Sequence, residues 1–126
     1  MKRALPIALI TVLPLVAHHS VKAGHDTSRI VTFKGTVTLV EFVNPHAHFY
    51  LDVVEPDGKV TNWAFEMVAP NALRRLGVPR NFLKEGEQVS VDAYAAKEGG
   101  KFASARTVTW PAGRTMDVHD SFGGQK

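Results

Sequence analysis

The chain has 126 residues, enough for one domain with a modest core, and its 44% hydrophobic content excludes wholesale disorder. It contains no cysteine, which excludes disulfides, thiolate metal sites and cysteine nucleophiles. The formal net charge is +3, but without Lys2 and Arg3 the chain has 13 basic residues against 12 acidic ones. A chain with nearly equal numbers of basic and acidic residues lacks the excess of positive charge that binds nucleic acid. We therefore expect no nucleic-acid partner.

Residues 1–17 have the composition of a secretory signal peptide. Lys2 and Arg3 form a positively charged start, and the apolar run of residues 4–16 follows. A run of about 13 apolar residues is too short to cross a bilayer, which needs about 20. We therefore expect an exported protein, periplasmic or secreted, with no integral membrane segment after processing.

Two cleavage sites compete at the end of this signal. A cut after Ala17 would make His18 the first residue of the mature chain. A cut after Ala23 would remove both His18 and His19 together with the signal. The site after Ala17 is favoured because it lies closer to the apolar run, and this choice decides whether the two histidines belong to the mature protein.

The first strand is expected directly after a flexible segment, residues 18–29. Between residues 30 and 43, apolar side chains alternate with threonine and lysine, which predicts a long strand with one buried face. Gly35 falls on the inward series, where a missing side chain lets a strand coil or bulge sharply. The other members of that series are Val31, Phe33, Val37, Leu39 and Val43.

Two more strands are expected before any helix. The sequence NPH breaks the first strand at residues 44–46, and a second strand over residues 46–55 leads into a hairpin turn at Glu55–Lys59. The third strand covers residues 60–68. The side chains expected to face inward on these strands are Phe49, Leu51 and Val53, then Trp63, Phe65 and Met67.

A short helix is expected over residues 70–77, with Asn71 as its cap and Gly77 as its end. Two further strands follow it, the first burying Val89, Val91 and Ala93 and the second covering residues 102–110. The β-domain is thus expected over residues 30–111, followed by a loose tail at residues 112–126. Five strands with one helix between the third and fourth predict an all-β fold, a five-stranded OB-fold-like barrel in the order β-β-β-α-β-β. A small sandwich or roll is the competing architecture.

Histidines are the main candidates for chemistry. His46 and His48 lie two residues apart, so they are expected to point the same way, outward and opposite to Phe49. Imidazole suits copper, zinc and nickel, so this pair is a reasonable half-site for a metal, although an exposed His-x-His is more often plain solvated surface. Cleavage after Ala17 would give His18 a free amine beside its imidazole. With a third nitrogen this makes a T-shaped copper(II) site that resembles the histidine brace of copper oxygenases and copper carriers.

Carboxylate and aromatic residues supply further candidates. Glu41 is expected on the inward series of the first strand, and Glu66 on the face of the third strand opposite Trp63. Either carboxylate could be a ligand, a partner that orients His46, or an ordinary hydrogen-bonded charge at a strand end. The candidate ligand-binding residues are Asn44 at the NPH break, Tyr50 and Trp63, although an indole in a small barrel is usually core.

No catalytic signature stands out. The chain lacks the G-x-S-x-G elbow, the H-E-x-x-H zinc motif, the P-loop and the G-x-G-x-x-G fingerprint. A barrel of this size also leaves little room for a deep substrate pocket. We therefore expect a protein that is not an enzyme.

Five stretches together resemble one known family. They are AHHS at residues 17–20, GTVTLVEFVNPH at 35–46, VTNWAFE at 60–66, PNALRRLG at 70–77, and the run from Leu83 to Arg114. They are similar to a family of small exported bacterial proteins of unknown function that share an AHHS start and an NPH turn. The resemblance implies a periplasmic, OB-like single domain with no established activity. It also implies matches at His18, His19, Ser20, Gly35, Glu41, Asn44, Pro45, His46, Trp63, Glu66, Pro70, Asn71 and Leu73.

The resemblance changes which histidines are expected to bind. Members of that family more often carry an aromatic residue where this chain has His48, so the expected ligand set shifts to His18, His19 and His46, with Glu66 nearby. The functional expectation is a periplasmic protein that binds Cu(II) or a similar transition metal ion. The alternative is an envelope interaction module that binds a peptide, a polymer or a partner protein on the barrel face, without metal.

Overall fold

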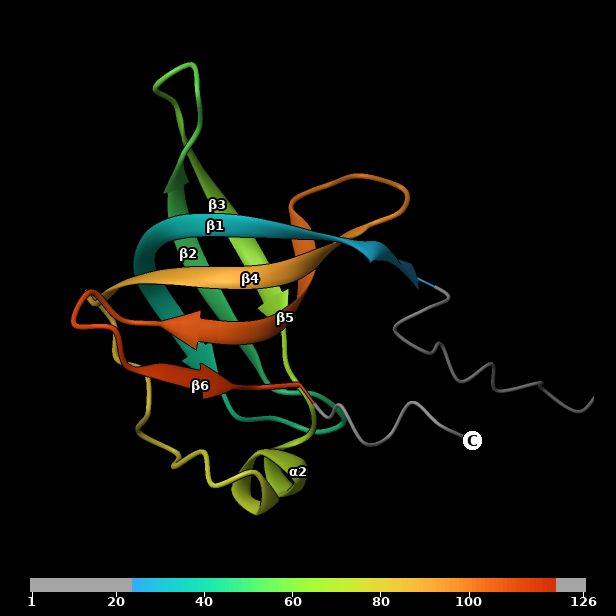
Figure 1. Cartoon of the computed structure of the whole chain (residues 1–126), viewed down its shortest axis with the longest axis vertical. Coiled ribbons are helices and arrows are strands. Elements are labelled where there is room, and N and C mark those ends of the chain that lie inside the picture. The colour runs from blue at the N-terminus through green and yellow to red at the C-terminus, as the bar shows by residue number, and fades with distance from the viewer. Residues whose placement is uncertain (1–23, 120–126) are drawn as a thin grey trace, which may run out of the picture.

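The computed structural model describes residues 24–119, and the dominant element there is the 17-residue strand β1 (His25–Glu41). The first part of β1 pairs antiparallel with β4 (Gln88–Ala96), and its last part pairs antiparallel with β2 (His48–Val54). Near its middle β1 is paired on both edges. One strand therefore curls through the wall of the molecule (Figure 1).

The remaining pairings close this wall into a ring. Strand β2 pairs with β3 (Val60–Glu66), and β4 pairs with β5 (Phe102–Thr109), both antiparallel. A short parallel pairing between β3 and β5 completes a closed five-stranded mixed barrel. The helix α2 (Pro70–Arg75) lies between β3 and β4 in the chain. The predicted all-β barrel with one short helix is confirmed, and the sandwich or roll does not form.

Gly35 is the residue that makes the double pairing possible. It pairs with Val53 of β2 on one edge and with Val89 of β4 on the other. A Cβ atom at this position would collide with the backbone carbonyl oxygen of Asp52 and would lie 3.1 Å from the Cβ of Leu51. The glycine predicted to coil the strand therefore stands where the neighbouring backbone approaches most closely.

The core is built from the predicted inward faces of β2, β3 and β4. Phe65 lies at its centre, stacked on Phe49 at 5.1 Å between ring centroids and meeting the edge of Phe33 at 5.2 Å. Each of these rings belongs to a different strand, so the core joins three strands through aromatic contacts. The side chains confirmed as buried are Phe33, Val37, Phe49, Leu51, Val53, Phe65, Met67, Val89, Val91 and Ala93.

The end of β1 departs from the predicted pattern. The pairing register shifts between Val37 and Leu39, which marks an irregularity in the strand. An extra residue at this point reverses the side-chain alternation, so Val40 packs against the core while Leu39 and Val43 are exposed. The inward placement predicted for Leu39, Val43 and Glu41 is therefore wrong.

The start of α2 differs from expectation, whereas its end agrees with it. The cap is Ala69, which makes no side-chain capping bond, rather than Asn71. At the other end, Gly77 has φ +80°, its N–H donates to the carbonyl of Arg74, and the N–H of Val78 donates to that of Leu73. These two bonds form a Schellman motif, and both Leu73 and Val78 are buried. The predicted stop at glycine is thus confirmed by its geometry.

Regular structure extends beyond the predicted domain limits at both ends. Strand β1 already begins at His25, and a sixth strand, β6 (Thr115–Asp117), pairs with β5 outside the ring. After β6, Val118 is fully buried, and its N–H donates to the carbonyl of Arg106. Three residues of β6 are too few to show alternation in the sequence, which is why this strand was not predicted.

Other predictions for the chain ends concern residues outside the described part. The signal peptide at residues 1–17 and the histidines His18 and His19 lie there. Among residues 24–119, no helix combines the length and apolar character that a bilayer crossing requires.

Candidate functional site

At one end of the barrel, the carboxylate of Glu66 lies between the imidazole rings of His46 and His48. Oε1 of Glu66 lies 3.1 Å from Nδ1 of His46, and its Oε2 lies 3.8 Å from Nε2 of His48. All three side chains reach solvent, with exposed fractions of 46% for His46, 26% for His48 and 21% for Glu66. We call these three residues the His–Glu cluster.

The backbone around Ala47 explains why both histidines reach the same carboxylate. Ala47 is fully buried; its N–H donates to the carbonyl of Val68, and its own carbonyl accepts from the N–H of Met67. These two hydrogen bonds hold Ala47 against the residues that follow β3, with its side chain facing the core. The side chains of His46 and His48, on either side of Ala47, therefore point outward. Position 46 precedes β2 instead of belonging to it, yet it shares the outward side of His48 as predicted.

Strand register adds two neighbours to the cluster. His48 pairs with Glu66 of β3 on one edge and with Glu41 of β1 on the other, and Glu66 pairs in parallel with Ser104 of β5. Paired residues share a face, so Glu41, His48 and Glu66 form a row across three strands on the outside of the barrel, which Ser104 continues on β5 as a buried side chain. The sequence could not reveal this row, because the irregularity in β1 and the β3–β5 closure both set the register.

The chemistry of the cluster follows from the contact of His46 with Glu66. A carboxylate oxygen close to Nδ1 favours the proton on that nitrogen, so Nε2 keeps the lone pair that a metal ion needs. In the described part of the chain no hydrogen bond or ion pair engages Nε2 of His46. At the same time, residues 24–119 hold no group of three or more His, Asp or Glu side chains arranged to bind a metal ion. A metal site that includes His46 therefore needs donors from elsewhere in the chain.

The proposed ligand-binding residues lie around the barrel rather than in one place. Phe33 lies 4.6 Å from the ring of Trp63, and Nζ of Lys101 lies 4.8 Å from it. The indole N–H of Trp63 donates to Oε1 of Glu55 at 2.9 Å. Trp63 is thus held in the wall of the barrel, with its ring and its N–H already engaged, whereas Tyr50 is half-buried and Asn44 is exposed in the loop before β2.

The contact of Trp63 with Glu55 predicts a change of stability with pH. The indole hydrogen bond, with the charge of Lys101, lowers the pKa of Glu55 below its ordinary value of 4.5. This stabilisation is present above pH 4.5 and is lost as the pH falls through the lowered pKa. We expect Glu55→Gln to lower the midpoint of chemical denaturation near pH 7 and the difference to disappear once the pH lies below the lowered pKa of Glu55.

The control for this prediction is Glu85→Gln, which changes an exposed carboxylate in the same way. It should unfold like the parent chain at both pH values. A Glu55→Gln deficit that persisted in acid would contradict the role of the carboxylate charge.

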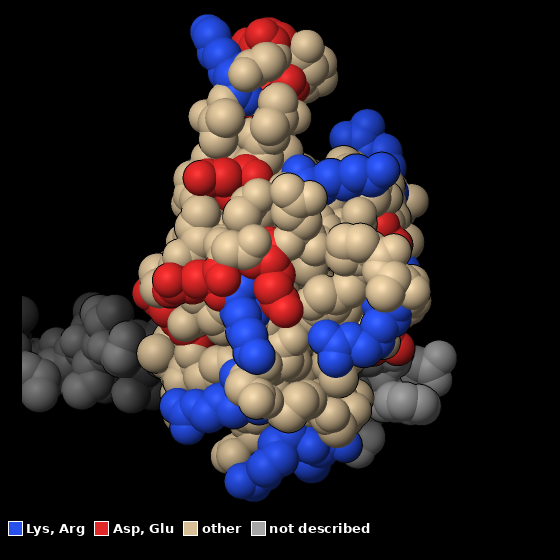
Figure 2. Space-filling model, turned by 90° about the vertical axis from the view of Figure 1, so that its left-hand side faces the viewer, with Lys and Arg blue, Asp and Glu red and all other residues tan. Residues whose placement is uncertain are grey.

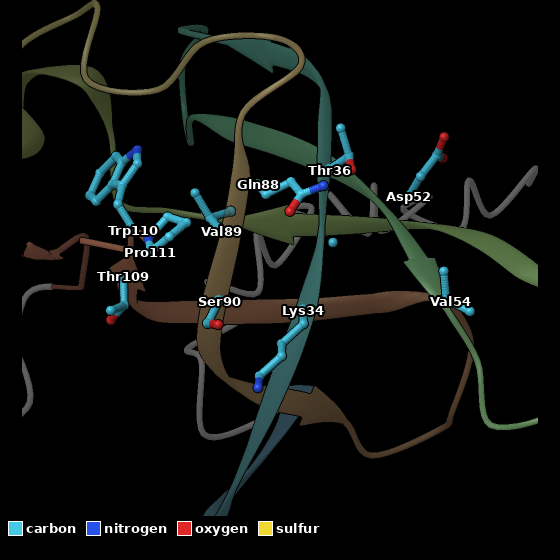
Figure 3. A pocket seen from close by; sticks show the side chains of 11 residues that line it. Lys34, Thr36, Asp52, Val54, Gln88, Val89, Ser90, Thr109, Trp110 and Pro111 are labelled. Carbon is cyan, nitrogen blue, oxygen red and sulfur yellow. The ribbon is translucent and has the colours of Figure 1, made fainter. Parts of the chain in front are cut away.

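A hollow lies on a different part of the barrel surface, over the bend of β1 (Figure 3). Its volume is about 480 Å³, and polar and apolar side chains of β1, β2, β4, β5 and the two residues after β5 surround it. The carboxylate of Asp52 at its edge already accepts a hydrogen bond from Asn62. Its lining consists of Lys34, Gly35, Thr36, Asp52, Val54, Gln88, Val89, Ser90, Thr109, Trp110 and Pro111. The hollow contains none of the predicted site residues.

Two further histidines were not singled out from the sequence. His25 is buried at the start of β1 with its ring 5.3 Å from Phe102, and neither ring nitrogen has a hydrogen-bond partner among residues 24–119. The ring of His119 lies 6.0 Å from that of Tyr94. His25 falls in the predicted flexible segment, residues 18–29, and His119 falls in the predicted loose tail, residues 112–126. No pattern in the sequence therefore marked either histidine.

The fold and the cluster together define a small β-barrel protein that carries an exposed His–Glu cluster at one end. The chain belongs to a family of unknown function (DUF6152), whose model matches residues 8–105. That match covers β1 to β4 and part of β5, and it includes the whole His–Glu cluster. No curated protein matches the chain.

Proposed function

We propose that the protein is exported, loses residues 1–17 and binds Cu(II) or a similar transition metal ion without catalysing a reaction. The proposed ligands are the amine and imidazole of His18 and the imidazole of His46, with His19 and His48 close by. The observation that carries this proposal is the position of Glu66, whose carboxylate meets Nδ1 of His46 at 3.1 Å.

The role of Glu66 is to set the orientation and tautomer of His46, so that Nε2 can bind the metal ion. Metal-binding histidines commonly give their second ring nitrogen to a carboxylate, which sets the tautomer and raises the basicity of the ligating nitrogen. His46 has such a carboxylate, and its side chain is exposed enough to meet a donor from another segment. A ligand set made only of amine and imidazole nitrogens favours Cu(II) in a tetragonal arrangement over the harder Mg²⁺ and Ca²⁺.

The test begins with the intact mass of the exported protein. A mature chain that starts at His18 should bind one Cu(II), with nitrogen ligands visible by paramagnetic resonance. Glu66→Gln should weaken the affinity by about tenfold or more, because it removes the charge that orients His46. The matched control is Glu98→Gln, an exposed carboxylate in the turn between β4 and β5, which should leave the affinity unchanged. A mature start at Gly24, or an unchanged spectrum in His18→Ala, would refute the proposal.

One observation favours the alternative function, a module that binds an envelope peptide, polymer or protein without metal. Leu39 has 40% of its surface exposed and pairs with Tyr50 across β1 and β2, beside Glu41 and His48. Tyrosine is enriched in contact surfaces, and the exposed Leu39 would extend such a surface at Tyr50. Under this alternative the protein would bind copper no better than an isolated His-x-His, and Leu39→Ser would abolish partner binding.

A further inference from the structure

Three exposed arginines belong to α2 and the segment that directly follows it. Arg74 and Arg75 occupy the last turn of this helix, and both are exposed. Leu76 follows with 37% of its surface exposed. Arg80 is also exposed, and its guanidinium lies 5.7 Å from the ring of Phe42. We call Arg74, Arg75, Leu76 and Arg80 the basic end.

The charge of the basic end is not neutralised by neighbouring residues. Within residues 24–119, none of the three arginines has a salt-bridge partner. From residue 67 to residue 84 the chain contains no Asp or Glu, and acidic residues resume only at Glu85 and Glu87. Figure 2 shows Lys and Arg atoms over the lower end of the molecule without acidic atoms among them, whereas the visible acidic atoms and further basic ones lie higher up.

Helix electrostatics explain only part of this arrangement. Cations in the last turn of a helix interact favourably with its dipole, and Arg74 and Arg75 have that position. Arg80 lies beyond the helix, after Gly77 and Pro79, where the dipole effect has faded. The helix dipole therefore accounts for Arg74 and Arg75 but not for the exposed position of Arg80.

The shape of this end favours a broad partner over a small ligand. In Figure 1, α2 is the outermost element at the lower end, where it covers the barrel with Leu73 buried and Arg74, Arg75 and Leu76 exposed. The hollow near Lys34 and Asp52 lies elsewhere on the surface. An outermost helix end with an exposed leucine among arginines matches a flat anionic surface into which an apolar side chain can partly insert.

We propose that the basic end docks the protein on an anionic phospholipid membrane. Arginine binds phosphate oxygens through a rigid two-pronged contact, and the ring of Phe42 holds the guanidinium of Arg80 in place. Three arginines provide weak, reversible and salt-sensitive attachment, to which Leu76 adds a small apolar contribution. This interaction involves none of the residues of the His–Glu cluster and does not depend on copper.

The test is sedimentation of the purified protein, its N-terminus determined by mass, with lipid vesicles. One set contains phosphatidylcholine alone, and the other contains equimolar phosphatidylcholine and phosphatidylglycerol. We expect binding to the anionic set only, with loss of affinity at high salt. Replacing Arg74, Arg75 and Arg80 by Gln should weaken this binding about a hundredfold, because each cation near such a surface contributes about fivefold.

The matched control replaces Arg29, Lys34 and Lys59 by Gln, which removes the same charge from other exposed positions. It should retain nearly all the binding, and circular dichroism should show both triple variants folded. Equal loss in the two triple variants would overturn the proposal, because net charge alone would then explain the binding. Binding to soluble polyphosphate but not to vesicles would also overturn it, as would equal binding to neutral vesicles.

Discussion

Replacing Gly35 by Val should strongly destabilise the barrel. The new side chain would begin with a Cβ that collides with the carbonyl oxygen of Asp52, a backbone atom that cannot rotate away. Because β1 is paired at this point with both β2 and β4, relief of the collision must break one pairing. We expect a loss of about 3 kcal/mol or more, a large part of the stability of a small domain.

Urea denaturation would measure this loss as a midpoint lowered by about 1 M or more. The matched control is Gly24→Ala, since a Cβ at Gly24 would meet no atom within 4 Å. The control should unfold like the parent chain. A Gly35→Val variant with an unchanged midpoint would mean that the double pairing of β1 can open at little cost.

The parts of the fold that the sequence predicted are those set by local alternation. Phe49, Leu51 and Val53 lie inward because every second residue of a strand shares a face, and this rule needs no knowledge of partners. Leu39 and Val43 were misplaced because one irregularity in the pairing reverses the rule for all residues after it. The position of that irregularity depends on how β1 fits between β2 and β4, which a single sequence does not reveal.

The same distinction applies to the site. His46 and His48 were predicted to share a side, and they do, because Ala47 between them points inward. That Glu66 would meet both could not be settled, since it depends on the length and geometry of the β2–β3 hairpin. The position of Glu41 beside His48 was missed altogether, because the irregularity moves it from the inner series to the outer row.

The second large effect is expected when His18 and His46 are replaced one at a time and together. If both bind one Cu(II) ion, each histidine raises the local concentration of donors for the other, an advantage of about 10²–10⁴-fold for linked ligands. We therefore expect His18→Ala and His46→Ala each to weaken Cu(II) binding about a hundredfold or more. His48→Ala should have a smaller effect, because its Nε2 lies 3.8 Å from the Glu66 carboxylate and the expected ligand is His46.

The combination of the two changes separates one shared site from two independent ones. With a shared ion, the double variant should lose much less affinity than the product of the two single losses, since either change already breaks the chelate. Independent weak sites would instead give additive losses, with two copper ions bound to the parent chain. Isothermal titration with competing chelators would measure both the affinities and the stoichiometry. Unchanged thermal unfolding of His46→Ala would show that an exposed ligand was removed without disturbing the barrel. Additive losses would rule out a bridge from the N-terminus to the barrel and leave His46 and Glu66 as an ordinary surface pair.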